Sequence, residues 1–211
     1  MHKVYITGIA GFIGFHLAEK LAMDGYEVEG VDNFNDYYDP QLKHDRANIL
    51  KDKFGIKIID YDIEIIPWAH YLEGYDAVIH LAAHAGVRHS LENPQMYIDT
   101  NITATQRLIH ACEHYEIPVI YASSSTADSD HLNPYAWSKY VNEKQFETSK
   151  LLSSGLRFYT VYGEYGRPDM ALHTFADLMS QGKEIDIYNE GDMQRDFTYV
   201  GDLVDGIEII L

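Results

Sequence analysis

Basic residues are scarce in this chain of 211 residues. Lysine and arginine together number 16, against 33 aspartate and glutamate residues, and the formal net charge at pH 7 is −17. A negative excess of this size repels nucleic acid and anionic lipid surfaces, so we exclude both as partners. Anionic ligands must instead be held locally, by individual arginines and by the N-terminal ends of helices.

Cysteine and long apolar runs are scarce as well. The single cysteine, Cys112, excludes an internal disulfide and is typical of a reducing compartment. No leader sequence precedes Lys3, and no apolar run approaches the roughly 20 residues of a membrane-spanning helix. His110 and His114 have zinc-like spacing but lack a third ligand in the sequence, so we expect no metal. These observations predict a soluble, cytoplasmic protein.

Strand-like and helix-like segments alternate along the chain, a pattern that predicts a parallel sheet with helices on both faces. Strands are expected at 3–7, 26–31, 56–60, 77–81, 117–121, 156–160 and 185–188. Helices are expected at 15–23, 40–53, 94–113, 133–152, 170–180 and from about 200, with an irregular or short helical link over 64–72. The tail beyond Gly163 is expected to form a small lobe folded back over the sheet edges.

A glycine turn follows the first strand at once. Gly8, Gly11 and Gly14 have the spacing Gly-x-x-Gly-x-x-Gly and lead into an apolar stripe at helical spacing. A strand, a glycine turn and a helix in this order are typical of a dinucleotide-binding unit, in which the helix N-terminus faces a pyrophosphate. The alternative is a glycine-rich turn that binds nothing. The sequence therefore predicts an α/β fold, a Rossmann-type doubly wound parallel sheet over 1–162, and a reduced substrate lobe over 163–211 whose closing helix can return to the first domain.

The second strand ends in an acidic residue, Asp32, which lies 18 residues after Gly14. An acid near this place holds a ribose 2′-hydroxyl in NAD-type sites, and its charge favours NAD over NADP. Asp62 and Ile63 follow the third strand, where an adenine is expected, and small residues after the fourth strand allow close approach of a cofactor. The candidate cofactor-binding residues are Gly8, Gly11, Phe12, Ile13, Gly14, Asp32, Asn33, Asn35, Asp62, Ile63, Leu81, Ala82, Ala83, Lys139 and Tyr159.

Two residues of the helix expected at 133–152 form a candidate catalytic pair. Tyr135 and Lys139 are spaced i and i+4, so both side chains leave one face of the helix. A nearby ammonium lowers a tyrosine pKa, which makes Tyr135 a general-base candidate for the oxidation of an alcohol. A serine of the run 123–125 can share the proton network, and the residues alone leave open which one. The alternative is an ordinary surface helix, because this pair is common by chance.

Several stretches together resemble the extended short-chain dehydrogenase/reductase family, also known as the NAD-dependent epimerase/dehydratase family. Within it the chain is similar to the UDP-glucuronate 4-epimerases. The matching stretches are 7–14, 32–40, 80–88, 134–139 and 156–163, together with 167–171 and 195–200. The resemblance runs almost from end to end. The stretch 32–40, and the group formed by 156–163, 167–171 and 195–200, distinguish this subgroup from other members.

The resemblance implies roles for individual residues. Tyr135 is expected to be the base, Lys139 to bind the nicotinamide ribose, and Ser124 to be the hydroxyl partner. The expected substrate-binding residues are Ser125 and Thr126 along the sugar, Thr160 and Arg167 at the C6 carboxylate with Arg88 assisting, Arg195 at the UDP pyrophosphate, and Tyr188. The resemblance also implies NAD as the cofactor, a UDP-sugar substrate, and a homodimer formed through the helices near 94–113 and 133–152.

The implied reaction is C4 epimerisation of UDP-glucuronate to UDP-galacturonate through a transient 4-keto sugar. Ser125 and Thr126 stand where related dehydratases and decarboxylases carry an acidic residue, which favours the epimerase. The alternatives are another sugar-nucleotide epimerase or decarboxylase, or a catalytically weak protein that binds NAD and nucleotide sugars.

Two departures from the family pattern bear on the substrate site. The loop after Thr126 is shorter than in family members, and Asn133 and Pro134 arrive early. The chain also stops at Leu211, whereas family members continue with more of the substrate lobe. From the sequence we therefore expect a uridine site that is incomplete, wide open or completed by a neighbouring subunit, and we predict weak substrate binding.

Overall fold

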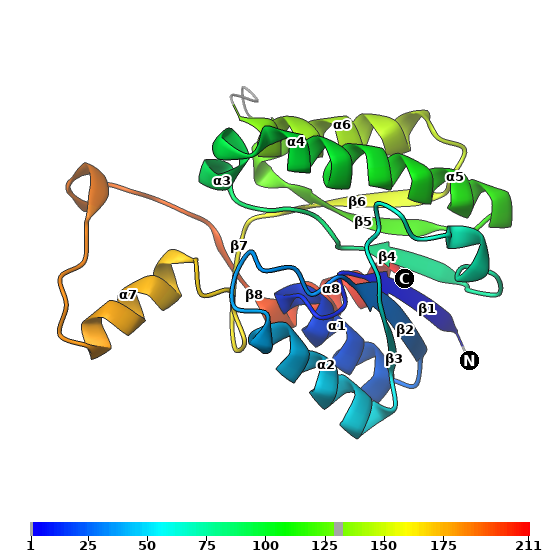
Figure 1. The fold of residues 1–211 in the computed structure, drawn as a ribbon, viewed down its shortest axis with the longest axis horizontal. Helices are drawn as coiled ribbons and strands as arrows, with labels where there is room; N and C mark the ends of the chain where they lie inside the picture. The colour runs from blue at the N-terminus through cyan, green and yellow to red at the C-terminus, as the bar shows by residue number, and fades with distance from the viewer. Residues whose placement is uncertain (1, 129–132) are drawn as a thin grey trace.

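A six-stranded parallel sheet forms the centre of the molecule in a computed structural model, which describes residues 2–128 and 133–211 (Figure 1). The strand order is β3-β2-β1-β4-β5-β6. The strands are β1 (Lys3–Thr7), β2 (Glu27–Asp32), β3 (Lys57–Asp60), β4 (Ala77–His80), β5 (Val119–Ser124) and β6 (Ser153–Phe158). This is the doubly wound arrangement expected from the sequence, and that prediction is confirmed.

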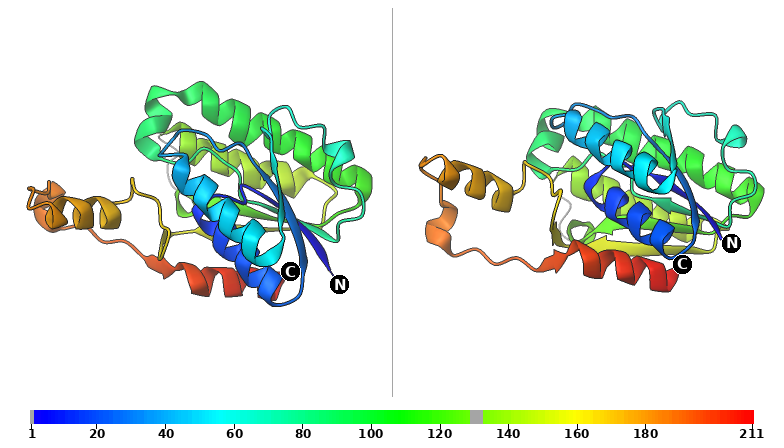
Figure 2. Two further views of the ribbon diagram at one scale, coloured as in Figure 1. Left: turned by 60° about the horizontal axis from the view of Figure 1, so that its bottom comes forward. Right: turned by 90° about the horizontal axis from the view of Figure 1, so that it is seen from below.

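Helices cover both faces of the sheet (Figures 1 and 2). One face carries α1 (Phe12–Met23), α2 (Gln41–Phe54) and α8 (Val200–Ile210). The other carries α3 (Val87–Glu92), α4 (Pro94–Met96), the π-helix η2 (Tyr97–Ala104), α5 (Thr105–Tyr115) and α6 (Pro134–Thr148). Short 3₁₀-helices occur at η1 (Trp68–His70), η3 (Ser125–Asp128) and η4 (Tyr188–Gly191).

Neighbouring residues of each central strand point to opposite faces of the sheet, which divides the core in two. Ile6 of β1 packs with Phe15 of α1 and Ile207 of α8 on one face. Tyr5 of the same strand packs with Leu108 of α5 and Phe146 of α6 on the other. Because both faces are covered, the central strands are apolar almost throughout, as parallel strands of this kind are.

The strand order reverses between β1 and β4, since the chain first builds outward to β2 and β3 and then crosses to β4, β5 and β6. At such a switch point the loops after two neighbouring strands diverge, and a crevice opens at their carboxyl ends. The glycine turn after β1 and the segment after β4 meet there. The fold thus brings the residues singled out in the sequence to one edge of the sheet.

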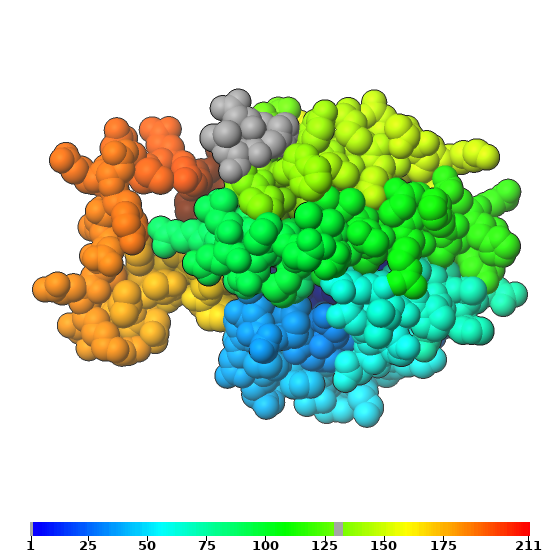
Figure 3. All heavy atoms as spheres, turned by 45° about the horizontal axis from the view of Figure 1, so that its top comes forward, coloured from blue at the N-terminus to red at the C-terminus, as the bar shows by residue number. Residues whose placement is uncertain are grey.

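The tail beyond β6 differs from expectation. It contains β7 (Thr160–Tyr162), α7 (Ala171–Ser180) and β8 (Phe197–Tyr199), and β7 pairs with β8 in a separate two-stranded sheet. The strand expected at 185–188 is absent, and β8 was not expected. The expected folding back over the sheet edges is also wrong for the segment between β7 and β8, which extends away from the sheet (Figures 1 and 3). We call residues 163–196 the arm.

After the arm the chain returns to the main sheet layer. Val200, Val204 and Ile207 of α8 are buried in the same apolar cluster as Phe15 and Leu21 of α1. The division into domains at residues 162 and 163 stays a prediction.

Candidate functional site

A cavity of about 520 Å³ opens at the carboxyl ends of the central strands. Its walls come from the glycine turn, the loop after β2, the segment after β4, the end of β5, the start of α6 and both ends of the arm. Residues far apart in the sequence therefore face one space.

The glycine turn forms one wall of this cavity. Gly8 has a φ of +73°, a left-handed conformation that other residues adopt only with strain. A Cβ atom added to Gly14 would lie 2.2 Å from the carbonyl oxygen of Gly8, so only glycine allows α1 to start this close to the turn. Gly11 is the N-cap of α1 and, like the first residues of that helix, lines the cavity. The free backbone amides of the helix N-terminus are therefore at the cavity. These features fit a pyrophosphate.

Asp32, at the end of β2, is buried beside the glycine turn. Its Oδ2 accepts a hydrogen bond from the Ala10 amide, and its Oδ1 accepts one from the Phe34 amide, both at 3.0 Å. Burial raises the pKa of the Asp32 carboxyl, and the charge of Lys43 with these amides acts in the opposite direction. The carboxylate is thereby fixed against the turn while still lining the cavity.

The candidate cofactor residues gather as expected, with one exception. All of them line the cavity except Asp62, whose Oδ2 accepts a hydrogen bond of 2.9 Å from the Asn33 amide nitrogen. Sequence reasoning missed Lys43, a cavity residue whose Nζ donates to the carbonyl and side-chain oxygens of Asn35 at 3.0 and 2.8 Å. These features fit a dinucleotide: the glycines of the turn lack side chains, the acid Asp32 is buried beside it, and the cavity is large enough.

The catalytic candidates meet further along the same cavity. Ser124 ends β5, and its hydroxyl is hydrogen-bonded to the Thr126 hydroxyl at 2.9 Å. Ser124 also acts on Tyr135, since it lowers the pKa of that phenol. Asn133 caps α6 by accepting a hydrogen bond from the Ala136 amide at 2.9 Å, which places Tyr135 and Lys139 in the first turns of that helix. Ser123 instead donates to Glu143 at 2.5 Å. Ser123 is thus engaged by Glu143, whereas Ser124 influences Tyr135, and the role of Ser124 stays a prediction.

The electrostatic setting of this group differs from the sequence-based expectation in one respect. Burial raises the pKa of Tyr135, whereas the hydrogen bond with Ser124 and the charge of Arg167 lower it. The expectation that the tyrosine pKa falls is wrong for this structure, because desolvation outweighs both influences. Burial also lowers the pKa of Lys139 to about 8, and its Nζ donates to the Ala122 carbonyl at 2.8 Å.

A buried asparagine in the π-helix ties this region together. The side chain of Asn101 accepts from the His84 amide at 2.8 Å and donates to the His84 carbonyl at 3.0 Å. Its Nδ2 also donates to the Ser138 hydroxyl at 2.9 Å, and that hydroxyl donates to the Tyr135 carbonyl at 2.8 Å. The segment after β4 is thereby fixed to the start of α6. Asn101 was not identified from the sequence, because the spacing of apolar residues does not indicate the π-helix on which it lies.

The expected substrate residues divide into two groups. Ser125, Thr126, Thr160, Arg167 and Arg195 line the cavity. Arg88 and Tyr188 do not, and lie together instead, with the guanidinium carbon of Arg88 5.6 Å from the centre of the Tyr188 ring. The shorter loop expected after Thr126 falls partly on residues 129–132, outside the described residues.

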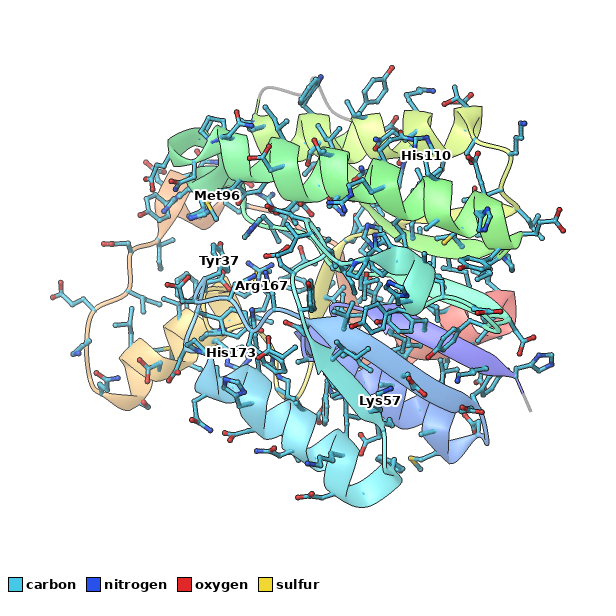
Figure 4. The ribbon with its side chains drawn as sticks, turned by 45° about the vertical axis from the view of Figure 1, so that its right-hand side comes forward. Tyr37, Lys57, Met96, His110, Arg167 and His173 are labelled. Carbon is cyan, nitrogen blue, oxygen red and sulfur yellow. The ribbon has the colours of Figure 1, made fainter. Side chains whose placement is uncertain are left out.

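The arm places Arg167 at the cavity close to Tyr37, which comes from the loop after β2 (Figure 4). Arg167 forms a two-pronged ion pair with Asp169, and Tyr37 also contacts Asp169. Asp169 and Tyr37 both line the cavity but were not singled out in the sequence.

Within residues 2–128 and 133–211, no group of three or more histidine, cysteine, aspartate or glutamate side chains has an arrangement that can hold a metal ion. Over the same residues, none of the helices combines the length and the apolar character needed to cross a bilayer.

The chain is similar to several known proteins. It is 45% identical to the protein CapI of Staphylococcus aureus over 228 residues, which covers 97% of this chain and 68% of that protein. It is 39% identical over 228 residues to a probable UDP-glucuronate 4-epimerase of Rhizobium meliloti, covering 97% of this chain and 67% of that one.

The chain is also similar to a solved structure. The crystal structure of a UDP-glucuronic acid 4-epimerase from Bacillus cereus, in complex with UDP-glucuronic acid and NAD, matches with a TM-score of 0.90 at 33% identity. The match covers 97% of this chain and 71% of that chain. The sequence profile of the NAD dependent epimerase/dehydratase family matches residues 4–211, and the chain belongs to that family.

Proposed function

We propose that the chain is an NAD-dependent nucleotide-sugar 4-epimerase that converts UDP-glucuronate to UDP-galacturonate. One observation carries the proposal: a single cavity contains the glycine turn, the Ser124, Tyr135 and Lys139 group, and Arg167. A dinucleotide along the glycine turn and Asp32 would bring its reactive end toward Tyr135, and a sugar nucleotide would fill the part toward the arm. The similar epimerase structure from Bacillus cereus, which contains NAD and UDP-glucuronic acid, supports this arrangement.

In the proposed mechanism, Tyr135 removes the proton of the C4 hydroxyl and later returns a proton to the same oxygen. Ser124, which lowers the pKa of Tyr135 and lines the same cavity, would hold the C4 oxygen in line with the tyrosine hydroxyl. Lys139 holds the ribose next to the reacting ring and contributes positive charge when protonated. NAD, when bound, supplies the acceptor and donor of the hydride at C4. C4 would be inverted if the keto sugar turned its other face to the cofactor next to Tyr135 before the oxygen is protonated again.

The carboxylate of the sugar has to be held during this sequence, because a 4-keto sugar with a C6 carboxylate is a β-keto acid and loses CO₂ readily. Arg167 suits this task, since a guanidinium forms two parallel hydrogen bonds to a carboxylate. Thr160, from β7, lines the same part of the cavity. A firm hold on the carboxylate would favour epimerisation over decarboxylation.

Incubation of the purified protein with UDP-glucuronate tests the proposal, with bound NAD measured first. Formation of UDP-galacturonate, detected by chromatography and NMR, is the expected result. A UDP-pentose with CO₂ would instead identify a decarboxylase, and conversion of UDP-galactose alone would identify a different epimerase. Tight binding of NAD with no turnover of any of these sugars would leave a binding protein.

A further inference from the structure

Arg167 is engaged by a carboxylate of its own chain. Its Nε donates to Oδ1 of Asp169 at 3.0 Å and its Nη2 donates to Oδ2 at 2.5 Å. The side chains are only 23% and 35% exposed, and both residues line the cavity. A partly buried, two-pronged pair of this kind fixes the orientation of the guanidinium plane more firmly than a surface ion pair does.

Tyr37 extends this pair to a second segment of the chain. Its hydroxyl donates to Oδ2 of Asp169 at 3.2 Å, and its ring centre lies 5.4 Å from the guanidinium carbon of Arg167. The same hydroxyl would lie 2.4 Å from a Cβ atom on Gly86, so Tyr37 is closely packed against the segment after β4. Figure 4 shows Tyr37 and Arg167 next to one another between the loop after β2 and the arm.

The pair leaves one side of the guanidinium available. A guanidinium has two edges that can each bind a carboxylate through parallel hydrogen bonds. Asp169 uses the edge formed by Nε and Nη2, and its two hydrogen bonds do not involve Nη1. The charge of Arg167 also acts on Tyr135, which places the guanidinium within electrostatic reach of the proposed base.

We propose that Asp169, held by Tyr37, is a positioning residue that orients Arg167 to receive the carboxylate of a uronic acid sugar. The inference rests on the proposed function and adds the device that would select carboxylate-bearing nucleotide sugars over neutral ones. An arginine side chain that moves freely loses rotamer entropy when a ligand fixes it. Here Asp169 and Tyr37 impose that order before the ligand binds, so more of the interaction energy appears as affinity.

Three variants test the inference. Asp169→Asn keeps the size of the side chain but removes its charge, and Tyr37→Phe removes only the hydroxyl that contacts Asp169. Asp177→Asn, on the exposed helix α7, is the matched control because it makes the same change of charge within the arm. For each variant, calorimetry measures the dissociation constants of UDP-glucuronate and UDP-glucose, and the readout is the ratio of the two.

We expect the wild type to prefer UDP-glucuronate. Asp169→Asn should reduce this preference about tenfold, Tyr37→Phe about threefold, and Asp177→Asn should leave it unchanged. Thermal unfolding of each variant excludes general loss of structure. A preference that is absent in the wild type, or unchanged in Asp169→Asn, overturns the inference. Tighter binding of UDP-glucuronate to Asp169→Asn also overturns it, because Asp169 would then compete with the ligand instead of positioning Arg167.

Turnover separates this inference from the proposed function. If the wild type produces no UDP-galacturonate, the proposed function fails, while the ratio of dissociation constants still decides the role of Asp169. If it is active, Asp169→Asn should release more CO₂ per turnover. In that side reaction the C5–C6 bond breaks, its electron pair enters the C4 carbonyl as an enolate, and C5 then takes up a proton to give a UDP-4-keto-pentose. A purely structural role of Asp169 would lower activity without changing this product ratio.

Discussion

Tyr135 is subject to opposing influences that determine how it can act. Desolvation favours its neutral form, while the hydrogen bond with Ser124 and the charge of Arg167 favour the phenolate. A tyrosine accepts a proton only as the phenolate, so groups that stabilise this charge support the proposed role of Tyr135 as a base. The residue therefore depends on its partners, and Ser124 and Arg167 are the two that the structure identifies.

Replacement of Tyr135 by phenylalanine removes the proposed base and keeps the ring. We expect turnover of UDP-glucuronate to fall about a thousandfold, within the range of 10²–10⁴ typical of a lost general base. Bound NAD and the melting temperature should stay close to wild-type values, because the ring still packs against Tyr97. Product formation, cofactor content and thermal unfolding are measured side by side. Activity within tenfold of the wild type would remove Tyr135 from the mechanism.

The buried charge of Lys139 lowers the stability of the folded chain, and this effect can be measured through its dependence on pH. Burial lowers its pKa from 10.5 to about 8, so its charge costs the folded state about 3 kcal/mol at neutral pH. Below pH 8 both the folded and the unfolded chain are protonated and the cost is complete. Between pH 8 and 10.5 the unfolded chain binds the extra proton, so the contribution of Lys139 to stability rises with pH.

Lys139→Met removes the buried charge at similar volume. It leaves the Ala122 carbonyl without its lysine donor, which costs about 1–3 kcal/mol, so we expect a small net gain in stability at pH 7 of about 1 kcal/mol. This gain should shrink and reverse as the pH rises from 8 toward 10.5, while turnover is lost at every pH. Urea unfolding of both proteins across this range is the measurement. A stability difference that does not vary with pH would contradict the assignment.

At the scale of the element, two glycines on helices make a matched pair. A Cβ atom on Gly14 of α1 would lie 2.2 Å from a backbone oxygen, whereas one on Gly206 of α8 would meet no atom within 4 Å. We expect Gly14→Ala to destabilise the fold by about 1–3 kcal/mol and to reduce bound NAD, because α1 must move away from the turn. Gly206→Ala should stabilise it by about 0.5–1 kcal/mol, because alanine loses less backbone entropy in a helix.

Denaturant unfolding and cofactor content of the two alanine variants measure these effects. The sign of the change in stability is the decisive result. If both substitutions changed the free energy of unfolding equally, the close contact between Gly14 of α1 and the glycine turn would be contradicted.

The elements that the sequence predicted well are those whose local pattern coincides with their tertiary setting. The strand expected at 3–7 is found at Lys3–Thr7, because it is a short apolar run that ends at a glycine with positive φ. The stretch 94–113 reads as one helix, yet it contains the π-helix Tyr97–Ala104 and begins after the separate helix α3. A π-helix adds one residue to a turn and leaves the apolar pattern on either side intact, so the sequence does not reveal it.

The remaining predictions failed where the structure depends on which distant segments pair with one another. Alternating apolar residues at 185–188 suggest a strand, but no strand of the described chain lies beside them, and Phe197–Tyr199 pairs with β7 instead. In the candidate site, the resemblance identified Arg167 as a cavity residue. It did not identify Tyr37 and Asp169, which lie 132 residues apart and meet only through the paths of two loops. Contacts of this kind have no signature in local sequence.

At the scale of the whole molecule, the acidic charge and the arginines of the cavity act over different distances. The net charge of −17 repels an anionic sugar nucleotide at long range, but screening at physiological salt limits this effect to about 8 Å. Arg167 and Arg195, which line the cavity from the two ends of the arm, act at contact distance. Together with the cavity residues Lys43 and Lys139, the arm would supply the local attraction for such a ligand.

The arm also contains a poorly packed helix, α7. None of the residues of α7 is buried, and Leu172 and Met179 are 49% and 65% exposed. An element with few buried apolar contacts opens locally at low cost in free energy, whereas the central sheet opens only with global unfolding. Ligand contacts at Arg167 and Arg195 would join the two ends of the arm to the sheet and raise the cost of opening.

Limited digestion with trypsin tests this difference. We expect the first cut after Lys183, in the exposed segment that follows α7, well before any cut after Lys51 or Lys53 in the packed helix α2. Addition of UDP-glucuronate should slow the cut after Lys183 at least fivefold without changing the later cuts. Mass spectrometry of the fragments over time is the measurement, and UDP-glucose serves as the ligand without a carboxylate. First cleavage within α2 would show that the arm is not the weaker element. A rate after Lys183 that UDP-glucuronate leaves unchanged would show that the arm is not part of the ligand site.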